Sequence, residues 1–407
     1  MRDYSTDFWK LLVGQTVSSL GSSFTLFALP LLIFKLTNSA IALALMTVAE
    51  YIPFLLFGLA IGVWVDRIDR KRMMIFADVT QAVILCSVPL LSVLGLLSVW
   101  WIYAVGFISS TLWICFNTAE FASVPSLVRK TDLVRANGRL QASYSAATVT
   151  GPLLAGLLVA LVPVHTLLLF DAFSFLLSAL AVSLIGGRLD AVSEKNPRSK
   201  GLFDEVAEGL SFILGHPVLR ATCFLMALVN GVGFTVYAQL VLYAKERLGA
   251  SDTQVGLLYA AGSIGMVVLA LAAGPLRRHL SFSKAVLSAP MLGGIFIVLL
   301  ASTRWYWTAL VLWASIWGLV VFFDINTNSL LQTVVPEQLL GRVRSAVSVL
   351  SWSAIPLGTI VGGVAIERTQ DVALVYGAIG AIVSVAALVF TFTAVGHANR
   401  YLPPGKR

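Results

Sequence analysis

Residues 62–72 read Gly-Val-Trp-Val-Asp-Arg-Ile-Asp-Arg-Lys-Arg and lie between two long apolar runs, 40–65 and 73–94. A helix needs about 20 apolar residues to cross the hydrocarbon core of a bilayer, and both runs are long enough. Charged side chains stay out of that core unless they are paired or face a cavity. The sequence therefore predicts two transmembrane helices joined by a short basic loop at one membrane surface.

The same alternation of apolar runs and polar loops extends along all 407 residues. Hydrophobic residues make up 58% of the chain and charged residues only 12%, far below the share of about 25% in a typical soluble domain. Twelve runs are predicted to cross the membrane: 11–34, 40–65, 73–94, 99–121, 140–162, 166–185, 219–243, 255–274, 285–300, 307–325, 347–366 and 372–395. We therefore expect an all-α membrane protein of twelve transmembrane helices.

Lysine and arginine concentrate in alternate loops, such as 66–72 and 122–139. The opposite side of the membrane would hold five of the 28 basic residues, namely Lys35, Lys245, Arg247, Arg304 and Arg368. Because loops rich in lysine and arginine stay in the cytoplasm, we expect a multi-pass protein of the cell (inner) membrane with both termini cytoplasmic. The formal net charge of +8 then reflects membrane topology rather than binding to nucleic acid.

The longest loop, 186–217, divides the chain into two parts. Its stretch 193–201 is polar and rich in helix breakers, which is typical of a linker, whereas 202–214 has one apolar helical face. The opposite face carries Asp204, Glu205 and Glu208, so we expect this helix to pack on basic cytoplasmic loops rather than on anionic lipid. The expected organisation is an N-terminal six-helix bundle at 1–187, a linker with an amphipathic helix at 188–217, a second six-helix bundle at 218–396 and a cytoplasmic tail at 397–407.

The two parts of the chain show a weak similarity that keeps the order of the spans. A shift of 206 residues places Phe116 on Phe322 and Gly156 on Gly362. Duplicated halves of six spans are typical of transporters in which two bundles move about a central site near the midplane of the bilayer. The expected architecture is therefore two pseudo-symmetric six-helix bundles.

The stretch 62–72 resembles the signature of the major facilitator superfamily between spans two and three, Gly-x-x-x-Asp-Arg-x-Gly-Arg-Arg/Lys. Asp69 stands where the family usually has glycine. The resemblance implies the major facilitator fold and a secondary transporter. It also implies a gating latch at the cytoplasmic side, made of Gly62, Asp66, Arg67, Arg70, Lys71 and Glu120.

The physical logic of the gating latch rests on charges at helix ends. Asp66 is expected at a helix N-terminus, where free N–H groups and the helix dipole favour a carboxylate. The family places its partner at the start of span eleven, near 342–347, and pairs the loop arginine with an acid at the inner end of span four. We therefore expect Arg70 to pair with Glu120. The alternative is a basic loop that sets topology and has no gating role.

A second motif, Gly138-x8-Ala147-x3-Gly151-Pro152-x2-Ala155-Gly156, precedes and enters the fifth span. It resembles the drug:proton antiporter signature Gly-x8-Gly-x3-Gly-Pro-x2-Gly-Gly, with two glycines replaced by alanine. A Gly-Pro pair kinks a helix, and in that family the kink accompanies export rather than uptake. Ordinary packing of small residues between membrane helices is the alternative interpretation.

Shorter segments narrow the resemblance to one branch of the superfamily. Pro125-Ser-Leu-Val and Asp171-Ala-Phe-Ser-Phe175 are similar to segments of macrolide-efflux proteins and the enterobactin exporter. This branch implies bacterial export of drugs, siderophores or secondary metabolites, with coupling to protons. The arginine that many drug:proton antiporters carry in span four is missing, because 99–121 contains no basic residue.

Acids inside the spans are the first candidates for a transport site. A carboxylate at the bilayer centre costs about 2.5–3.5 kcal/mol to insert, so it usually faces a cavity or a partner. Glu50, near the middle of span two, and Asp324, near the inner end of span ten, are predicted to bind a proton or a substrate cation. Hydrogen-bonded structural acids are the alternative for both. Asp78 and Asp171 are expected to contribute less, because spans three and six pack on the outside of this fold.

The resemblance places spans one, four, seven and ten around the cavity. Polar and aromatic residues on these spans are the other candidate contacts for an amphipathic substrate: Gln15, Asn117, Asn230, Trp313 and Trp317. Gln15 also begins a polar stripe with Ser18, Ser22 and Thr25, which suits either a cavity wall or hydrogen bonds between helices. Because no basic residue falls deep within a span, the cavity is expected to favour neutral or cationic substrates.

Other classes of protein fit the sequence less well. The phosphate-binding loop Gly-x-x-x-x-Gly-Lys-Ser/Thr is absent, which argues against an ATP-driven pump. The four histidines, His165, His216, His279 and His397, are scattered, so we expect neither a metal site, a cofactor nor an enzyme active site. We expect a monomer in the lipid bilayer that exports small amphipathic molecules in exchange for protons. The alternatives are an importer or uniporter of the same fold, or a membrane receptor that transports nothing.

Overall fold

A computed structural model describes residues 6–65, 68–129, 132–186, 189, 202–336 and 339–398. These residues form helices joined by turns and contain no strand. Within them, eleven helices are long and apolar enough to cross a membrane. The remaining long helix, α5 (Leu133–Leu158), has 26 residues but is more polar and carries Arg135 and Arg139 in its first two turns. The expected all-α membrane fold is confirmed.

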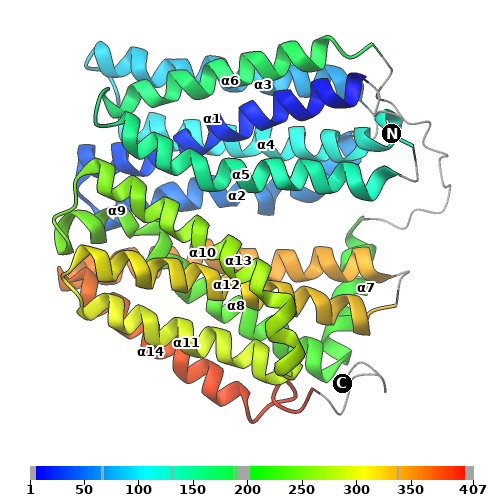
Figure 1. Ribbon diagram of the computed structural model, residues 1–407, viewed down its shortest axis with the longest axis vertical. Helices are drawn as coiled ribbons and strands as arrows, with labels where there is room; N and C mark the ends of the chain where they lie inside the picture. Colours follow the sequence, from blue (N-terminus) through cyan, green and yellow to red (C-terminus); the bar gives the residue numbers. More distant parts are fainter. Residues whose placement is uncertain are drawn as a thin grey trace. The chain divides into compact units, whose positions relative to one another are not determined.

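Figure 1 shows the helices in chain order from blue to red. The first half of the chain contributes α1 (Thr6–Thr37), α2 (Ala40–Val65), α3 (Arg70–Val93), α4 (Val99–Leu127), α5 and α6 (Leu167–Ser183), with the short helix η2 (Val164–Thr166) before α6. The second half contributes α7 (Leu202–Gly215), α8 (Pro217–Ala238), α9 (Leu240–Leu242), η3 (Tyr243–Arg247), α10 (Asp252–His279), α11 (Phe282–Ser302), α12 (Tyr306–Val334), α13 (Leu340–Thr369) and α14 (Val372–Phe390).

The helices form two compact units that follow the two halves except for two short segments. The first unit comprises Met1–Asn38, Ala49–Pro197 and Ser251–Ala260. The second comprises Ser39–Val48, Arg198–Ala250 and Ala261–Arg407. The start of α2 therefore belongs to the second unit, and the start of α10 belongs to the first.

Buried polar contacts hold the start of α2 within the second unit. The amide of Gln239 donates a hydrogen bond of 2.7 Å to the carbonyl of Ala40. The carboxylate of Glu367, near the end of α13, accepts bonds of 3.2 Å from the N–H of Ala40 and 3.3 Å from the hydroxyl of Ser39. Glu367 thereby satisfies N–H groups that would otherwise be unpaired at the beginning of a helix.

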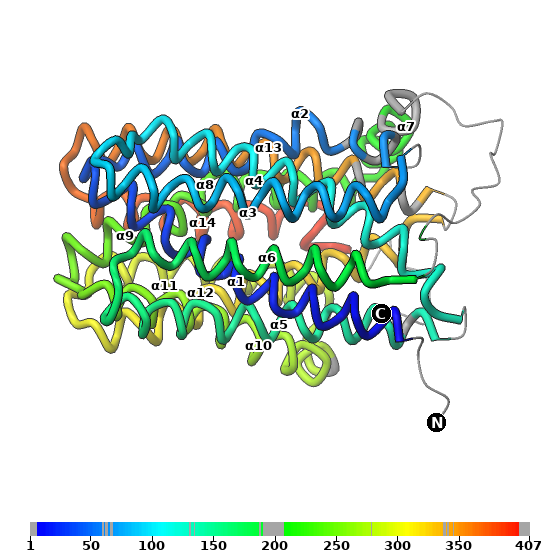
Figure 2. The backbone as a smooth tube through the Cα atoms, turned by 90° about the horizontal axis from the view of Figure 1, so that it is seen from above, coloured from blue at the N-terminus to red at the C-terminus, as the bar shows by residue number. Residues whose placement is uncertain are grey.

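In the first unit, α6 packs against both α1 and α3, while α4 packs on α3 and α5 packs on α1 (Figures 1 and 2). Local caps define where two of these helices begin. The side chain of Asp69 accepts a bond of 3.0 Å from the N–H of Arg72 at the start of α3. The hydroxyl of Ser98 accepts one of 3.3 Å from the N–H of Trp101 at the start of α4. Both residues are of the types that favour N-caps.

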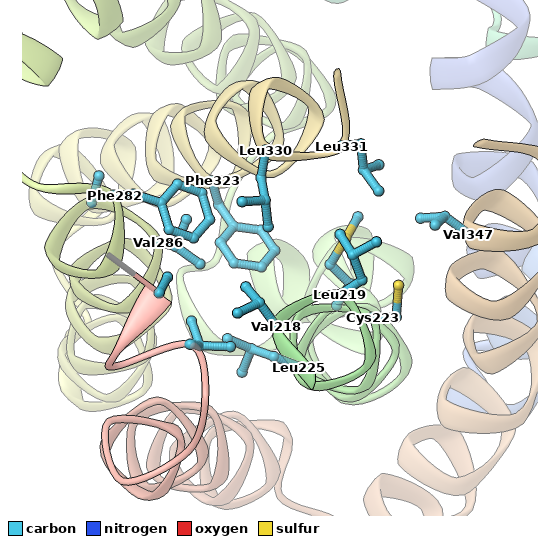
Figure 3. Packing of buried hydrophobic residues seen from close by; sticks show 14 of the residues in the cluster. Val218, Leu219, Cys223, Leu225, Phe282, Val286, Phe323, Leu330, Leu331 and Val347 are labelled. Atoms are coloured by element: carbon cyan, nitrogen blue, oxygen red, sulfur yellow. The ribbon is translucent and has the colours of Figure 1, made fainter. Parts of the chain in front are cut away.

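The core of the second unit lies between α8, α11 and α12. Figure 3 shows side chains of these helices, among them Leu219, Phe323 and Leu330, pointing into the space between them. Val395 and Ala398, just beyond α14, are also completely buried in this core. The chain therefore packs against the second unit up to at least residue 398, past the point where the sequence predicted a tail.

The amphipathic helix α7 also belongs to the second unit and packs on α13. Its Glu208 accepts a hydrogen bond of 2.9 Å from the guanidinium of Arg342 at the start of α13, which is an ion pair. A methyl group added to Gly209 would lie 2.5 Å from the carbonyl oxygen of Arg342, so the two backbones are in close contact. At Glu208, α7 thus meets a basic residue at the start of α13, as expected from the charge of its polar face.

The seventh predicted span, 219–243, is interrupted in the structure. The regular helix α8 ends at Ala238, and a short α9 and the wider turn η3 follow Gln239. Gln239 is fully buried and directs its amide toward α2 rather than toward solvent. Hydropathy did not reveal this break, because the residues on both sides of Gln239 are apolar.

Candidate transport site

The gating latch is only partly visible, because Asp66 and Arg67 lie outside the described residues. Gly62 falls in the last turn of α2. Arg70 is buried and donates hydrogen bonds to the carbonyl of Ala122 at 2.8 Å and to that of Leu189 at 3.4 Å. Lys71 donates one of 2.6 Å to the carbonyl of Ile185.

These contacts give the two basic residues a role that the sequence did not indicate. Arg70 binds the carbonyl of Ala122, which lies five residues before the end of α4, and Lys71 binds that of Ile185, two residues after the end of α6. Arg70 and Lys71 therefore connect the start of α3 to the last turns of α4 and to the segment that follows α6.

The expected ion pair between Arg70 and Glu120 is not formed. Glu120 is 8% exposed, and its Oε1 atom has no hydrogen-bond partner in the described part of the chain. The guanidinium of Arg70 instead binds the carbonyl of Ala122, on the same helix. The Arg70 guanidinium, which can only donate, bonds to the carbonyls of Ala122 and Leu189 instead of to the carboxylate.

The departure from the family signature at Asp69 has a local explanation. Besides capping α3, its carboxylate forms an ion pair of 3.3 Å with Arg72. Aspartate is among the best N-cap residues, whereas glycine is a weaker one. The side chain of Asp69 therefore caps the start of α3. Glycine at this position has no side chain with which to accept that N–H group.

The antiporter motif forms a surface of close packing on α5. A methyl group on Gly151 would lie 2.2 Å from Cβ of Ser23 in α1, and one on Gly156 would lie 2.8 Å from Cα of Gly256 in α10. Gly138 has open space instead. Pro152 lies inside α5, within this packed surface. The glycines at 151 and 156 thus permit close contact between helices. Such contact is compatible with a motif of exporters and also with ordinary packing of small residues.

Glu50 lies in the first unit, half-buried in α2. Tyr51 beside it and Tyr259 of α10 are near enough for the charge of Glu50 to act on them. Tyr259 also packs edge-on against Phe27, with ring centres 6.1 Å apart. The hydroxyl of Ser110 in α4 donates a bond of 2.5 Å to the backbone carbonyl of Glu50. The Glu50 carboxyl group is thus close to two tyrosine side chains, those of Tyr51 and Tyr259.

The other candidates of the first unit, Gln15 and Asn117, are half-buried on α1 and α4. The Oε1 atom of Gln15 is shielded from solvent and lacks a hydrogen bond in the part of the chain that the structure describes. Asn117 donates a bond of 3.1 Å back to the carbonyl of Trp113. In these described helices no hydrogen bond links Gln15 or Asn117 to Glu50, so the structure does not join the three into one network.

Asp324 lies deeper in its helix than the sequence suggested. The helix α12 extends to Val334, so ten residues, or about 15 Å at 1.5 Å per residue, separate Asp324 from its inner end. Asp324 is half-buried, and its backbone carbonyl accepts bonds from Thr327 and Asn328. Asn230 is half-buried on α8.

An aromatic group lies on α8 and α12 of the second unit. The ring of Tyr237 is 5.3 Å from that of Phe234 and 5.0 Å from that of Trp317. Trp313 is only 1% exposed and stacks behind Tyr237 at 6.5 Å, so it belongs to the core and not to a surface that a ligand reaches. The indole N–H of Trp317 has no acceptor among the described residues.

These features are typical of a membrane transport protein: two units of membrane-crossing helices, each with a half-buried carboxyl group inside a span, and an aromatic group with an indole N–H that has no acceptor among the described residues. The model of the Major Facilitator Superfamily matches residues 11–359. The chain belongs to this family of transporters.

Similar proteins extend over nearly the whole chain. The multidrug efflux pump Tap of Mycolicibacterium fortuitum is 26% identical over 363 residues, 87% of each chain. Macrolide efflux protein A of Streptococcus pyogenes is 24% identical over 372 residues, 90% of this chain and 91% of its own. Among solved structures, the nucleoside transporter NupG has a TM-score of 0.78 at 13% identity, covering 95% of this chain and 99% of its own. At that identity the likeness concerns the fold alone.

Proposed function

We propose that this protein is a secondary active exporter that moves drugs or other small amphipathic molecules out of the cell, in exchange for protons and by alternating access. The observation that carries the proposal is the match to proteins named as multidrug and macrolide efflux pumps over 87% and 90% of this chain. Those matches extend over both units, so the similarity covers the whole transporter and not one bundle of helices. The antiporter-like motif in α5 supports the same direction.

The substrate is neutral or cationic. Glu50 in the first unit and Asp324 in the second are inside spans, and no charged partner acts on either of them within the described residues. Each can therefore bind a substrate cation or a proton. Phe234, Tyr237 and Trp317 supply apolar area, and rings of this kind also attract cations.

Proton entry supplies enough free energy for export. Each elementary charge moved across the membrane is worth about 2.3 kcal/mol per 100 mV, and each tenfold gradient of a neutral substrate costs about 1.4 kcal/mol. One net charge at 100 mV therefore sustains a gradient between about ten- and a hundred-fold without ATP.

We infer a monomer in the cell (inner) membrane with both termini in the cytoplasm; the distribution of basic residues supports this orientation of the termini. A tag on the C-terminus tests this orientation. It should become accessible to an antibody only after the cell membrane is permeabilised. Labelling of intact cells would show that the C-terminus lies outside and would refute this topology.

The decisive experiment measures flux in everted vesicles with an imposed pH gradient and membrane potential. A panel of macrolides and lipophilic cationic dyes, chosen after a resistance screen in an efflux-deficient host, serves as substrate. Accumulation in the vesicles that an uncoupler abolishes is the expected result. Glu50→Gln and Asp324→Asn should reduce it, whereas Asp371→Asn, a capping acid at the start of α14, should not. Flux that ignores the uncoupler would remove proton coupling, flux only in the other direction would favour an importer, and no flux would favour a receptor.

A further inference from the structure

The first unit contains a buried line of acidic and hydroxyl side chains that the transport site does not use. It begins at the contact between α1 and α6. One face of α1 carries Gly14, Ser18, Gly21 and Thr25, and the facing side of α6 carries Asp171, Ser174, Ser178 and Ala181. A methyl group on Gly21 would lie 2.1 Å from the hydroxyl oxygen of Ser174 and 2.7 Å from Oδ1 of Asp171. The glycine therefore lets α6 press its polar side chains against the backbone of α1.

Asp171 is 1% exposed and is surrounded by neutral donors. Thr25 of α1 donates a hydrogen bond to its Oδ2 atom, and Ser174 donates one of 3.1 Å to Oδ1. The hydroxyl of Ser22 also lies near this carboxyl group. Hydroxyl groups can donate to a carboxylate and accept from a carboxylic acid, so this setting accommodates Asp171 in either protonation state.

Asp78 of α3 is the most unusual member of the line. It is 1% exposed, and neither of its carboxyl oxygens has a hydrogen bond within the described residues. Ser178 of α6, also 1% exposed, faces it. The helices α4 and α6 pack on α3, and the charged groups that act on Asp78 from them are two further acids, Glu120 and Asp171.

Among the described residues, therefore, no positive charge offsets Asp78. The short helix η2 also packs on α3, but its one titratable residue, His165, bonds to Ser92 in the last turn of α3, far along the helix from Asp78. An ionised carboxylate buried without a partner is so costly that the group takes up a proton instead. Two neighbouring acids add to that cost, because like charges repel.

The members of the line follow one another along the helices α6 and α3. Asp171, Ser174 and Ser178 are spaced over two turns of α6, about 10 Å at 1.5 Å per residue. Asp78 lies about 12 Å from the start of α3 by the same rise. The three helices α1, α3 and α6 lie side by side in Figures 1 and 2, with α6 touching both others. Glu120, at 8% exposure, is the least buried of the three acids.

We propose that Asp78, Asp171 and the serine hydroxyls between them form a proton-binding line inside the first unit, where the proton that drives export binds, with Glu120 as the group that exchanges it at the cytoplasmic end. The proton moves as a unit charge between carboxylate and hydroxyl oxygens, so no bond other than O–H forms or breaks. A proton is the ligand rather than a metal cation, because no three acidic, histidine or cysteine side chains of the described residues are placed to hold one.

This inference rests on the proposed exchange of substrate for protons and leaves Glu50 and Asp324 to the substrate. It also gives a function to the segment Asp171-Ala-Phe-Ser-Phe175. Asp171 and Ser174 point into the line, whereas Phe173 is 61% exposed on the outer side of α6. One segment thus provides two polar groups for the line and an apolar side chain for lipid.

The test compares Asp78→Asn and Asp171→Asn with the matched control Asp371→Asn in liposomes that contain a pH-sensitive dye. Asparagine has the shape of a protonated aspartate and cannot release a proton. Substrate counterflow at equal pH on both sides should stay within about twofold of the parent rate for all three variants, since the line touches no substrate. Proton movement driven by a substrate gradient should be lost in Asp78→Asn and Asp171→Asn and retained in the control.

Three results would overturn the inference. Parent-like proton movement in both variants would show that the acids are structural. Loss of counterflow together with proton movement would place them in the substrate path. Failure of both variants to fold would show that the carboxylates are charged in the native state. If the parent protein shows no counterflow with any substrate, the proposed function fails instead.

A measurement without transport then decides the inference by itself. Infrared spectra of the purified protein should show a carboxylic acid band near neutral pH that weakens in Asp78→Asn. A spectrum in which Asp78→Asn leaves that band unchanged would refute a protonated Asp78.

Discussion

Replacing Gly151 with alanine should destabilise this transporter, whereas the same replacement at Gly138 should not. Both glycines lie in α5 and both belong to the antiporter-like motif. A methyl group on Gly151 would lie 2.2 Å from Cβ of Ser23 and 2.6 Å from its hydroxyl oxygen, well inside van der Waals contact. The corresponding position at Gly138 has no atom within 4 Å.

The magnitude follows from two opposing effects. Overpacking a filled interface costs about 1–3 kcal/mol, and exchanging a glycine inside a helix for alanine gains about 0.5–1 kcal/mol. Gly151→Ala should therefore lose up to about 2.5 kcal/mol of stability, and Gly138→Ala should gain about 0.5–1 kcal/mol. The difference between the two variants reports the overpacking alone, because the change in helix propensity is common to both.

The assay is the apparent melting temperature of each purified variant in the same detergent and at the same heating rate, since membrane proteins often unfold irreversibly. A double variant, Ser23→Gly with Gly151→Ala, removes the Cβ atom that the new methyl would meet and should recover most of the loss. If Gly151→Ala melts as high as Gly138→Ala, or if Ser23→Gly brings no recovery, α5 does not contact α1 in the way described.

Three further changes address the loop between α2 and α3 and the helices beside it. Asp66→Asn should impair transport without lowering expression, because a charge at a helix N-terminus is worth about 0.3–1 kcal/mol, or about 2 when partly buried; normal export by this variant would exclude a gating role. Arg70→Ala and Glu120→Gln should have additive effects on transport in a double-mutant cycle, because Arg70 binds the carbonyl of Ala122 and not the carboxylate of Glu120. A clear interaction energy between the two changes would show that Arg70 and Glu120 do form an ion pair. Asp69→Ala should cost about 1 kcal/mol of stability and Asp69→Asn much less, and equal melting temperatures for the two would remove the cap.

Hydropathy was sufficient to predict the fold because membrane-crossing helices depend on local composition. The second span was predicted at 40–65, and α2 covers Ala40–Val65. The ends were less certain where polar residues continue a helix beyond the apolar run. The fourth span was predicted to end at 121, but α4 continues to Leu127 through Glu120 and Ser123, both of which are buried against neighbouring helices. Local hydropathy contains no information about such contacts.

The candidate site was harder to predict, because a buried polar side chain and one that faces a cavity have the same spacing along a helix. Thr25 was assigned to a possible cavity wall, but the structure directs it to Asp171 of α6, which is the alternative of interhelical hydrogen bonding. Asp78 and Asp171 were expected to contribute little, because their spans lie on the outside of the fold. The signal that could have revealed the contact between α1 and α6 was the matching spacing of small and polar residues on the two helices. It is visible only when the sequences of α1 and α6 are compared with each other.

The exchange of segments between the two units has a consequence for building hybrid transporters. A hybrid that joins the first half of this protein to the second half of a relative would have a native linker but foreign partners at two places. Ala40 would face a substitute for Gln239, and Gly156 would face a substitute for Gly256, where any side chain larger than hydrogen meets backbone. Hybrids should therefore carry residues 39–48 and 251–260 with the unit that each segment packs in, rather than with the half of the chain that encodes it.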